Sequence, residues 1–483
     1  MHRLPVWLAL GILVGGCTEG RLPTVPAPPR LTGVSAAPNP LNSLSFLMSF
    51  QTDGADSARV VYAVAGQAEQ STPWTPVGTS DSRLPVLGLK PATTYGLRVE
   101  VAGPGGRVVS DTLVATTGEA PAAIRGLTLQ WQPDPVTGYT LVVPVGYPSD
   151  VSNGYLLAFD GSGALCWYRE FDGGGWGVEA KQLSDGNFSV YLGRSYGYQA
   201  ADGHYVEITP DGQPVDSFRV GQPSFTDPHE MLLSLSGSVT EAIHLIGYDV
   251  STVDLSAYGG SATAQLAMHF IERQGPSGTL EFRWNAADHY LPADWPAPAT
   301  QAKLAPDLVH PSSLEIDRDG NYIVSLQAMD EIAKIDAQNG VFIWRLGGSH
   351  NQFRIDNDPL GGFQGQHDVR MLEDGHLLLL DDRIRSAPSS ARAVEYALNT
   401  QNMTATLVWQ YQPNPPVTSP IMGSVQRLSN GNTVVGFGFA GRVDEVDPAG
   451  NLLAQASLHG PGVASIEFYR ALRVPSLYRF ERP

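Results

Sequence analysis

The stretch that decides the fold is Gly365–Asp382, which reads GQHDVRMLEDGHLLLLDD. It predicts a strand, a tight turn and a second strand, because Asp374-Gly375 supplies the positive φ angles that a two-residue turn needs. The apolar run after the turn is short and bounded, which favours a buried strand over a helix. His367 lies at the start of the first strand, eight residues before the turn glycine.

The same frame recurs at 183–187, 235–237, 317–321 and 428–432. Counting back eight residues from the five turn glycines leads to Val178, His229, Ser312, His367 and Gly423. In the frame of Ser312, another histidine, His310, lies two residues earlier, as if the start of that strand were longer. Three repeats therefore place a histidine at or near one structural position.

From about residue 120 to the end, the sequence repeats in units of roughly 40 to 55 residues. The units begin near 127, 176, 227, 308, 365 and 422. Each unit has room for four strands, so residues 120–483 predict an all-β fold, a β-propeller of about six blades. The tail 466–478 has strand character and could close the ring against the first blade. A β-solenoid is the alternative, but the long and uneven repeat argues against it.

Residues 31–118 predict a small β-sandwich, because apolar and polar residues alternate along them. Leu89-Lys90-Pro91 leads through two threonines to Tyr95 at the start of a strand. This segment resembles the tyrosine corner of the fibronectin type III module. We expect this part to act as a spacer or packing module, since no chemistry is visible in it.

The N-terminus has a short basic start and an apolar run, followed by two glycines and Cys17. This pattern predicts a lipoprotein signal peptide at 1–16, lipidation of Cys17 and a proline-rich linker at 17–30. An ordinary secretory signal is the alternative. Thr18, in place of the aspartate that marks inner-membrane retention, favours the outer membrane. We therefore expect a lipid-anchored protein in the periplasm or cell envelope.

Composition excludes some functions. The net charge of −18 argues against a nucleic-acid partner, which needs a basic surface. Only 16% of the residues are charged, while 52 glycines and 37 prolines suit many short strands joined by turns. The second cysteine, Cys166, lies in an apolar segment and is expected to be a buried, inert thiol.

The innermost strands of a propeller line its central channel, so we expect His229, His310 and His367 to converge at one mouth of that channel. Three imidazoles could bind a metal ion. They could instead hold an oxyanion, with one neutral imidazole acting as a nucleophile. Spacing alone does not choose between these. The other histidines are expected at turns or on the surface: His204, His244, His269, His289, His350, His376 and His459.

The propeller resembles the bacterial arylsulfate sulfotransferases, which move a sulfuryl group from a phenolic ester to another phenol. The segments that carry the resemblance fall in order over about 120 residues: 310–317 (HPSSLEID), 344–348 (WRLGG), 366–369 (QHDV), 374–382 (DGHLLLLDD), 391–396 (ARAVEY) and 423–433 (GSVQRLSNGNT). The resemblance implies that His367 is the nucleophile and forms a sulfohistidine. It implies that His310 and His229 bind the sulfate oxygens and assist proton transfer. The partners would be a phenolic sulfate and a phenol, with no metal or other cofactor; a homodimer is left open.

The sequence departs from the family at one charged position. Where the family has an arginine on the strand after the His-Pro segment, this chain has Gln327, which can donate a hydrogen bond but carries no charge. Arg383 is our candidate for a second substrate-binding residue, with Arg385, Arg370 and Arg427 as other basic residues near the channel strands. The disulfide near the site in better-known members cannot form within this chain.

Two alternatives remain from the sequence. The first is a lipid-anchored binding propeller that keeps the fold without the chemistry, which the glutamine at position 327 favours. The second is a metal-dependent hydrolase or lyase that uses the three histidines as ligands. Glu230 and Asp368 adjoin two of the histidines, but neighbouring residues on a strand point to opposite faces, so they are poor co-ligands.

Overall fold

The computed structural model describes residues 26–78, 81–147, 154–171, 176–193, 203–236, 239–304, 307–386 and 389–478. The predicted signal peptide, the lipidated Cys17 and most of the predicted linker lie outside the described residues. Within the described part of the chain, no helix is both long and apolar enough to cross a membrane.

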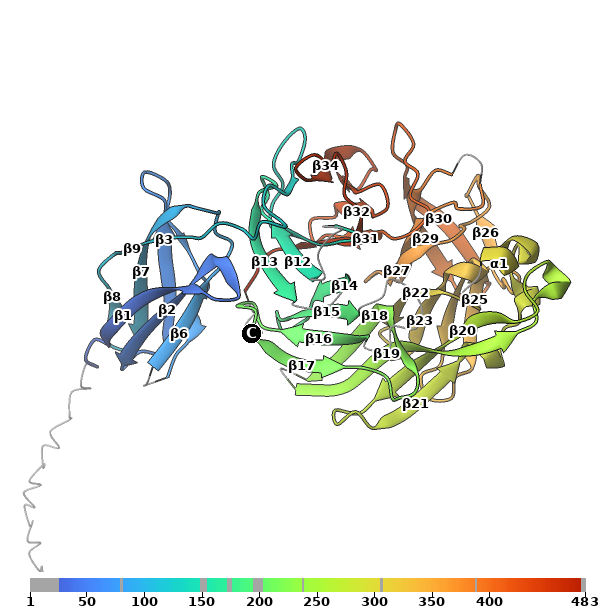
Figure 1. Cartoon of the computed structure of the whole chain (residues 1–483), viewed down its shortest axis with the longest axis horizontal. Coiled ribbons are helices and arrows are strands. Elements are labelled where there is room, and N and C mark those ends of the chain that lie inside the picture. The colour runs from blue at the N-terminus through green and yellow to red at the C-terminus, as the bar shows by residue number, and fades with distance from the viewer. Residues whose placement is uncertain are drawn as a thin grey trace, which may run out of the picture.

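The N-terminal part is a β-sandwich, seen at the left of Figure 1. One sheet contains β1 (Arg30–Asn39), β2 (Asn42–Asp53) and β6 (Asp81–Val86); the other contains β3 (Ser57–Ala63), β4 (Gln70–Ser71), β5 (Thr75–Pro76), β7 (Thr94–Gly103), β8 (Gly106–Val109) and β9 (Leu113–Thr116). Apolar side chains from both sheets share one core. The hydroxyl of Tyr95 accepts a hydrogen bond from the backbone N–H of Lys90 at 3.0 Å, the bond expected of a tyrosine corner. The likeness to fibronectin type III stays a prediction.

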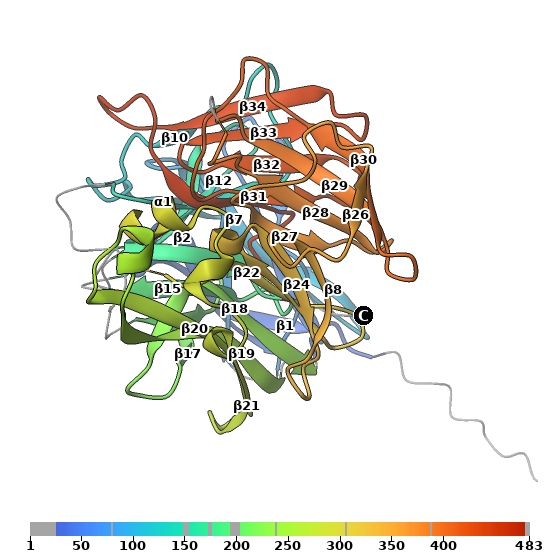
Figure 2. The same cartoon turned by 90° about the vertical axis from the view of Figure 1, so that its right-hand side faces the viewer.

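The rest of the chain forms six sheets around a common centre, as Figures 1 and 2 show. From the centre outwards, the first blade contains β35 (Phe468–Val474), β11 (Tyr139–Pro144), β12 (Gly154–Phe159) and β13 (Leu165–Phe171). The second contains β14 (Trp176–Gln182), β15 (Phe188–Gly193), β16 (His204–Ile208) and β17 (Pro214–Phe218). The third contains β18 (Phe225–Ser236), β19 (Val239–Val253), β20 (Ala264–Gln274) and β21 (Leu280–Asn285).

The other three blades follow the same plan. They are β22 (Pro311–Ile316), β23 (Tyr322–Leu326), β24 (Glu331–Ile335) and β25 (Phe342–Gly347); β27 (His367–Met371), β28 (His376–Asp381), β29 (Arg392–Asn399) and β30 (Thr404–Tyr411), with β26 (Arg354–Asp356) at the edge; β31 (Ser424–Arg427), β32 (Thr433–Phe437), β33 (Arg442–Val446) and β34 (Leu452–His459), with β10 (Thr128–Leu129) at the edge. The predicted all-β, six-bladed propeller is confirmed.

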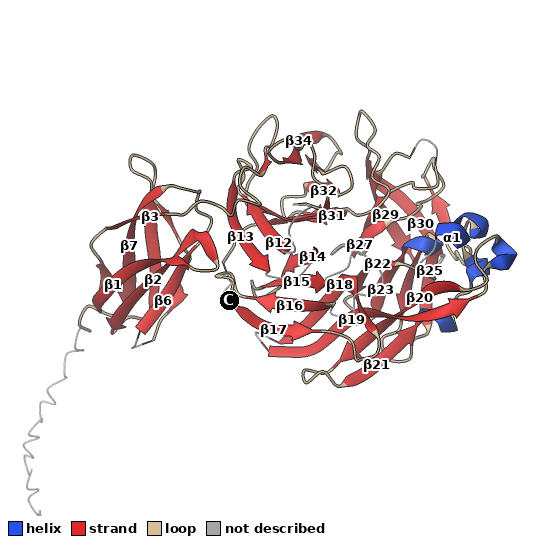
Figure 3. Ribbon diagram, viewed as in Figure 1, coloured by secondary structure: helices blue, strands red, loops and turns tan. Residues whose placement is uncertain are grey.

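Helical turns are few and short, as Figure 3 shows. They are η1 (Ser256–Tyr258), η2 (Ala286–Asp288), η3 (Pro292–Asp294), α1 (Pro298–Leu304) and η4 (Gln327–Met329). The turn glycines that the sequence frame singled out are locally as expected: Gly186, Gly320, Gly375 and Gly431 all have φ between +80° and +88°.

The ring is closed by the C-terminal strand. Each first strand contacts the first strand of the next blade, and β35 contacts both β31 and β14. β35 pairs with β11, with Leu472 opposite Leu141, so the first blade joins the two ends of the propeller sequence. The prediction that the first unit starts near 127 was wrong in one respect. Its innermost strand is β35, and residues 128–129 instead join the edge of the sixth blade.

The sandwich is more than a spacer, because it packs on the first blade. The backbone N–H of Ser43 donates to the hydroxyl of Tyr168 at 3.0 Å, and that of Leu87 donates to the hydroxyl of Tyr478 at 2.8 Å. The fully buried side chain of Leu87 belongs to a core cluster with propeller residues. The predicted inert thiol, Cys166, is fully buried, and burial raises its pKa well above the usual value.

Candidate active site

The structure brings His229, His310 and His367 together at the centre of the ring. His229 lies within β18, His310 immediately precedes β22, and His367 begins β27. The ring centroids of His229 and His310 are 4.7 Å apart, and those of His310 and His367 are 6.5 Å apart. Their side chains are 11%, 24% and 4% exposed, respectively. Three first strands therefore converge on one small site.

The backbone is irregular where these histidines lie. The pairing of each first strand with its neighbour shifts register beside the histidine. His310 and Asp368 have φ of +48°, a conformation that histidine and aspartate tolerate better than most residues. Bulges and unusual backbone angles gather at functional sites because they redirect side chains.

Each of the three imidazoles has an aspartate behind it. The Nδ1 atom of His229 lies 2.7 Å from Asp227, and that of His310 lies 2.7 Å from Asp307. The Nδ1 atom of His367 forms a short contact with Asp382. A carboxylate on Nδ1 orients the ring, and it favours the tautomer whose lone pair is on Nε2.

The protein environment pushes the three histidines apart in pKa. Burial lowers the pKa of His367 well below its usual value, and the neighbouring His310, His229 and Arg470 lower it further. Burial also lowers the pKa of His229, although Asp227 opposes the shift. For His310, the carboxylate of Asp307 outweighs burial and raises the pKa. The environment therefore favours the neutral imidazole at His367 and the protonated imidazole at His310.

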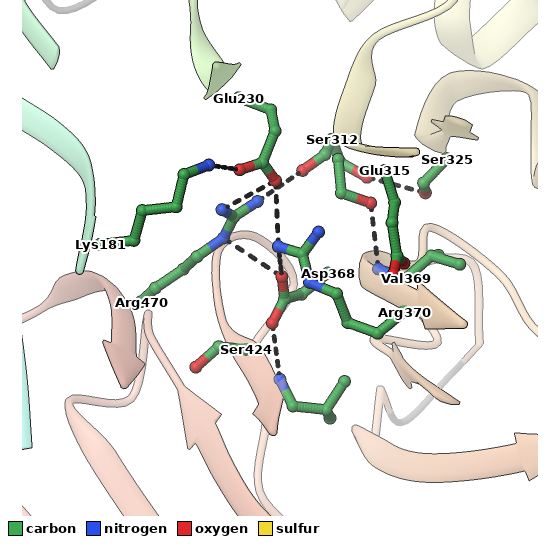
Figure 4. A network of polar contacts seen from close by, with 12 residues as sticks. Lys181, Glu230, Ser312, Glu315, Ser325, Asp368, Val369, Arg370, Ser424 and Arg470 are labelled. Atoms are coloured by element: carbon green, nitrogen blue, oxygen red, sulfur yellow. Dashed lines mark hydrogen bonds and ion pairs between the residues drawn. The ribbon is translucent and has the colours of Figure 1, made fainter. Parts of the chain in front are cut away.

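An ionic cluster lies on the innermost strands next to the histidines, and Figure 4 shows most of its side chains. We call it the charge plug; it consists of Lys181, Arg370, Arg470, Glu179, Glu230, Glu315 and Asp368. Arg470, 2% exposed on β35, forms ion pairs with Glu230 at 3.0 Å and with Glu179 and Asp368 at 3.4 Å. Arg370 lies 3.0 Å from Glu230 and also contacts Asp368.

Sequence reasoning missed Arg470 because the closing strand was not counted among the innermost strands. It also missed Tyr469, whose ring centroid is 5.9 Å from that of His229. Tyr469 packs with Val145 and Met422, and Val178 lies against the same small cluster. The imidazoles therefore adjoin a small apolar group that contains one tyrosine.

The predicted substrate-binding residues, Gln327 and Arg383, lie close to the histidines. Their contacts are with backbone carbonyls and with an aspartate. Gln327 is half-buried in η4, and its backbone N–H donates to the carbonyl of His310 at 2.9 Å. The guanidinium of Arg383 donates to the carbonyl of Gly362 at 3.0 Å and lies 3.7 Å from Asp381. Arg385 pairs with Asp330 at 2.7 Å.

Two histidines that were expected at turns or on the surface are instead buried, so that prediction was wrong for them. His244, on β19, lies 2.8 Å from the hydroxyl of Tyr322 and 3.0 Å from that of Ser234. His269, on β20, is 1% exposed and lies 3.1 Å from Asp227. The contacts of His244 with Tyr322 and of His269 with Asp227 join residues 78 and 42 positions apart, so no local signal reveals them.

The geometry argues against a metal ion bound by the three histidines. Across the described residues, the group whose possible ligand atoms all lie within 4.8 Å of one another is Asp374, His376 and Glu395. The imidazoles at the centre of the ring do not meet that condition. Glu395 is moreover paired with Arg427 at 2.6 Å. The adjacent Glu230 and Asp368 belong to the charge plug and not to the histidine group.

Comparison with solved structures finds matches of low similarity. A protein of unknown function from Bacteroides caccae has 12% identity and a TM-score of 0.43, covering 70% of this chain and 100% of its own. An inactive virginiamycin B lyase from Staphylococcus aureus has 11% identity and a TM-score of 0.36; the match covers 71% of this chain and 90% of the lyase chain. Hydrazine synthase of Kuenenia stuttgartiensis has 12% identity and a TM-score of 0.35, covering 75% and 94%. No curated protein matches the chain.

The comparison with protein families gives a match over the propeller. The model described as Arylsulfotransferase (ASST) matches residues 196–459, which is more than half of the 483-residue chain. The matched range contains the three central histidines, their aspartates and Gln327, and it ends before β35. This chain belongs to the arylsulfotransferase (ASST) family.

Proposed function

We propose that the protein is an arylsulfate sulfotransferase that moves a sulfuryl group from a phenolic sulfate ester to a phenolic acceptor, with His367 as the nucleophile. The observation that carries this proposal is the state of His367. Its ring is buried and held neutral, and its Nδ1 atom contacts Asp382. The ring adjoins the imidazole of His310. A neutral imidazole keeps the lone pair that nucleophilic attack needs.

The reaction proceeds in two transfers. In the first, Nε2 of His367 forms a bond to sulfur while the bond from sulfur to the phenolic oxygen breaks. His310, which holds a proton beside Asp307, gives that proton to the departing phenolate. In the second transfer, the acceptor phenol attacks sulfur, the bond from sulfur to nitrogen breaks, and the phenolic proton returns to His310. Asp382 stabilises the positive ring of the sulfohistidine by accepting from Nδ1.

The residues around the site suit an aryl sulfate. The proton that His310 holds can meet the charge that spreads over the sulfuryl oxygens during transfer. The apolar group of Tyr469, Met422 and Val145 adjoins His229 and suits an aromatic ring. The charge plug does not supply the missing arginine, because Arg470 is already paired with Glu179, Glu230 and Asp368. The protonated imidazole of His310 is therefore the cationic group that can face the sulfate.

The test is transfer from a chromogenic aryl sulfate, with and without added phenol. We compare the wild type with His367→Ala and with a matched control, His376→Ala, at the far end of the same strand pair. We expect acceptor-dependent turnover that falls at least 10³-fold in His367→Ala and stays within about twofold in the control. Folded wild-type protein without turnover on a panel of donors would refute the proposal in favour of a binding propeller. Equal activity in His367→Ala would refute the assignment of the nucleophile.

We also propose that the chain is tethered to a membrane of the cell envelope through a lipid on Cys17. The sequence pattern alone supports this, because these residues lie outside the described part of the structure. Labelling with a radioactive or clickable fatty acid in a bacterial host tests it. Label should enter the wild type and be lost in Cys17→Ser. Label in both proteins, or in neither, would contradict the anchor.

A further inference from the structure

His269 lies between the two aspartates that orient His229 and His310. Its Nε2 atom is 3.1 Å from Oδ2 of Asp227 and 4.0 Å from Oδ1 of Asp307. Asp227 lies on β18 in the third blade, whereas Asp307 precedes β22 in the fourth. The side chain of His269 is fully buried, so it does not reach the substrate side of the site.

Five side chains therefore form one connected group, which we call the shared-carboxylate group. It runs from His229 through Asp227, His269 and Asp307 to His310. Its two ends meet again, because the rings of His229 and His310 lie 4.7 Å apart. His367 stands outside this group, since it has an aspartate of its own.

The charges of this group restrict where its protons go. Two buried carboxylates are costly unless hydrogen-bonded cations or donors compensate them. His229 and His269 hold the pKa of Asp227 far below its usual range, against the effect of burial, so Asp227 is a carboxylate. The group must hold protons on its imidazoles to match the aspartates. Asp307 and Asp227 raise the pKa of His310 against the effect of burial, so its protonated form is favoured.

We propose that His269 is a positioning residue for proton transfer: it links Asp227 and Asp307, so that His229 and His310 act as one proton-sharing pair. This rests on the sulfotransfer proposed above. When the phenolate leaves, one proton moves from His310 to its oxygen, and the acceptor phenol later returns one. Between the two transfers the group is one proton short. His269 then remains hydrogen-bonded to Asp227 and close to Asp307, and it holds the two carboxylates in place.

The experiment replaces His269 by phenylalanine and by glutamine in the full-length protein. The matched control is His244→Phe, because His244 is also buried in the third blade but contacts hydroxyl groups instead of carboxylates. The first measurement does not need turnover. It follows the titration of the imidazoles by NMR of protein labelled with ¹⁵N-histidine, assigned by single substitutions.

The expected shift has a definite sign. Without His269, the two carboxylates attract the protons on the remaining imidazoles more strongly, so the pKa values of His229 and His310 rise by about one unit. They stay unchanged in His244→Phe. The other titratable groups that face the shared-carboxylate group are Tyr248 from β19, Tyr205 from β16, Tyr469 and Arg470 from β35, and His367. All of them are retained in every variant.

The second measurement is the pH dependence of transfer. We expect kcat to fall about tenfold in both His269 variants, with the KM for the donor within about twofold. The limb of the pH profile that reports loss of the proton from His310 should move to higher pH by the same amount as the NMR titration of His310. If His269→Phe does not fold, His269→Gln decides, because glutamine keeps a donor but cannot be protonated.

The outcomes separate the two proposals. Unchanged titration of His229 and His310 in a folded His269 variant would overturn the inference, whatever the activity. An equal shift in His244→Phe would also overturn it, because the effect would then follow from loss of packing. Shifted titration together with a wild type that transfers no sulfuryl group would refute sulfotransfer while leaving the electrostatic link between the two pairs established.

Discussion

Two charged layers lie next to each other at the centre of the ring, and both are buried. The first, which we call the mouth layer, consists of His229, His310, His367 and their partners Asp227, Asp307 and Asp382. In the charge plug, glutamates and an aspartate instead face arginines and a lysine. One step along a strand leads from one layer to the other, as in His229-Glu230, His367-Asp368 and Tyr469-Arg470. The difference lies in the cation, because histidine can lose its proton near neutral pH and arginine cannot.

This difference suggests a division of labour. The plug ties the first strands together with charges that do not change during a reaction. The mouth layer uses charges that can change, so protons can leave and return while the strands beneath stay in place. If that is correct, substitutions in the mouth layer should affect activity far more than stability. Substitutions in the plug should do the opposite.

The largest effect is expected from Asp382→Asn in the mouth layer. Asparagine keeps the shape of the side chain but can donate to Nδ1 of His367, which favours the tautomer whose Nε2 carries the proton. We expect kcat to fall about 10³- to 10⁴-fold, by analogy with a serine-protease triad whose aspartate is replaced in this way. The thermal midpoint should change little. Asp374→Asn, in the exposed turn of the same strand pair, is the control and should stay within about twofold.

In the plug, Arg470→Met should mainly reduce stability. Methionine fills the space but leaves Glu179, Glu230 and Asp368 without their shared cation. Breaking such a buried pair costs about 3–5 kcal/mol in the free energy of unfolding, measured by urea titration of the propeller transition. The control is Arg354→Met, which breaks the exposed pair with Asp356 and should leave the free energy of unfolding nearly unchanged. Equal losses in the two variants would mean that the plug contributes no more than a surface pair.

A smaller effect is expected at Glu179, the plug residue whose charge depends on pH. Burial raises its pKa from 4.5 to about 7, although Lys181 and Arg470 oppose the shift. Between these two values the folded chain binds the proton and the unfolded chain does not, so wild-type stability falls as pH rises from 4.5 through 7. Glu179→Gln removes this loss.

The stability advantage of Glu179→Gln over the wild type should therefore grow by about 2 kcal/mol between pH 5 and pH 8. Urea titrations of both proteins at the two pH values measure it. An advantage that is constant or shrinks with pH would show that Glu179 is already ionised at pH 5. In that case the whole plug would be a layer of fixed charge.

Most of the ring follows from local sequence signals. Turn glycines such as Gly375 and the apolar runs after them fix strand pairs, and their spacing fixes the number of blades. The positions of His229 and His367 follow from the same register. Asp227 and Asp307, two and three residues before their histidines, were visible in the sequence, but nothing local showed that they would contact the rings.

Other parts depend on long-range contacts that no local pattern contains. Asp382 reaches His367 because the hairpin pairs His367 with Leu380, two residues before the aspartate. Arg470 and Tyr469 reach the centre because the chain end supplies the innermost strand of the first blade. His269 lies on the third strand of its blade, and its contact with Asp227 depends on how that strand packs behind the first.

The smallest effect, essentially none, is expected from removing metal ions. Histidines backed by carboxylates are also the usual surroundings of a metal ion, so the mouth layer could be mistaken for such a site. However, the ring centroids of His310 and His367 are 6.5 Å apart. Among the described residues, the three histidines do not bring their ligand atoms within 4.8 Å of one another. Dialysis against a chelator, with the metal content measured before and after, should leave sulfuryl transfer within about twofold. A loss of activity that zinc restores would contradict this. A bound metal would put a permanent charge in the mouth layer, and the contrast between an exchangeable layer and a fixed one would no longer hold.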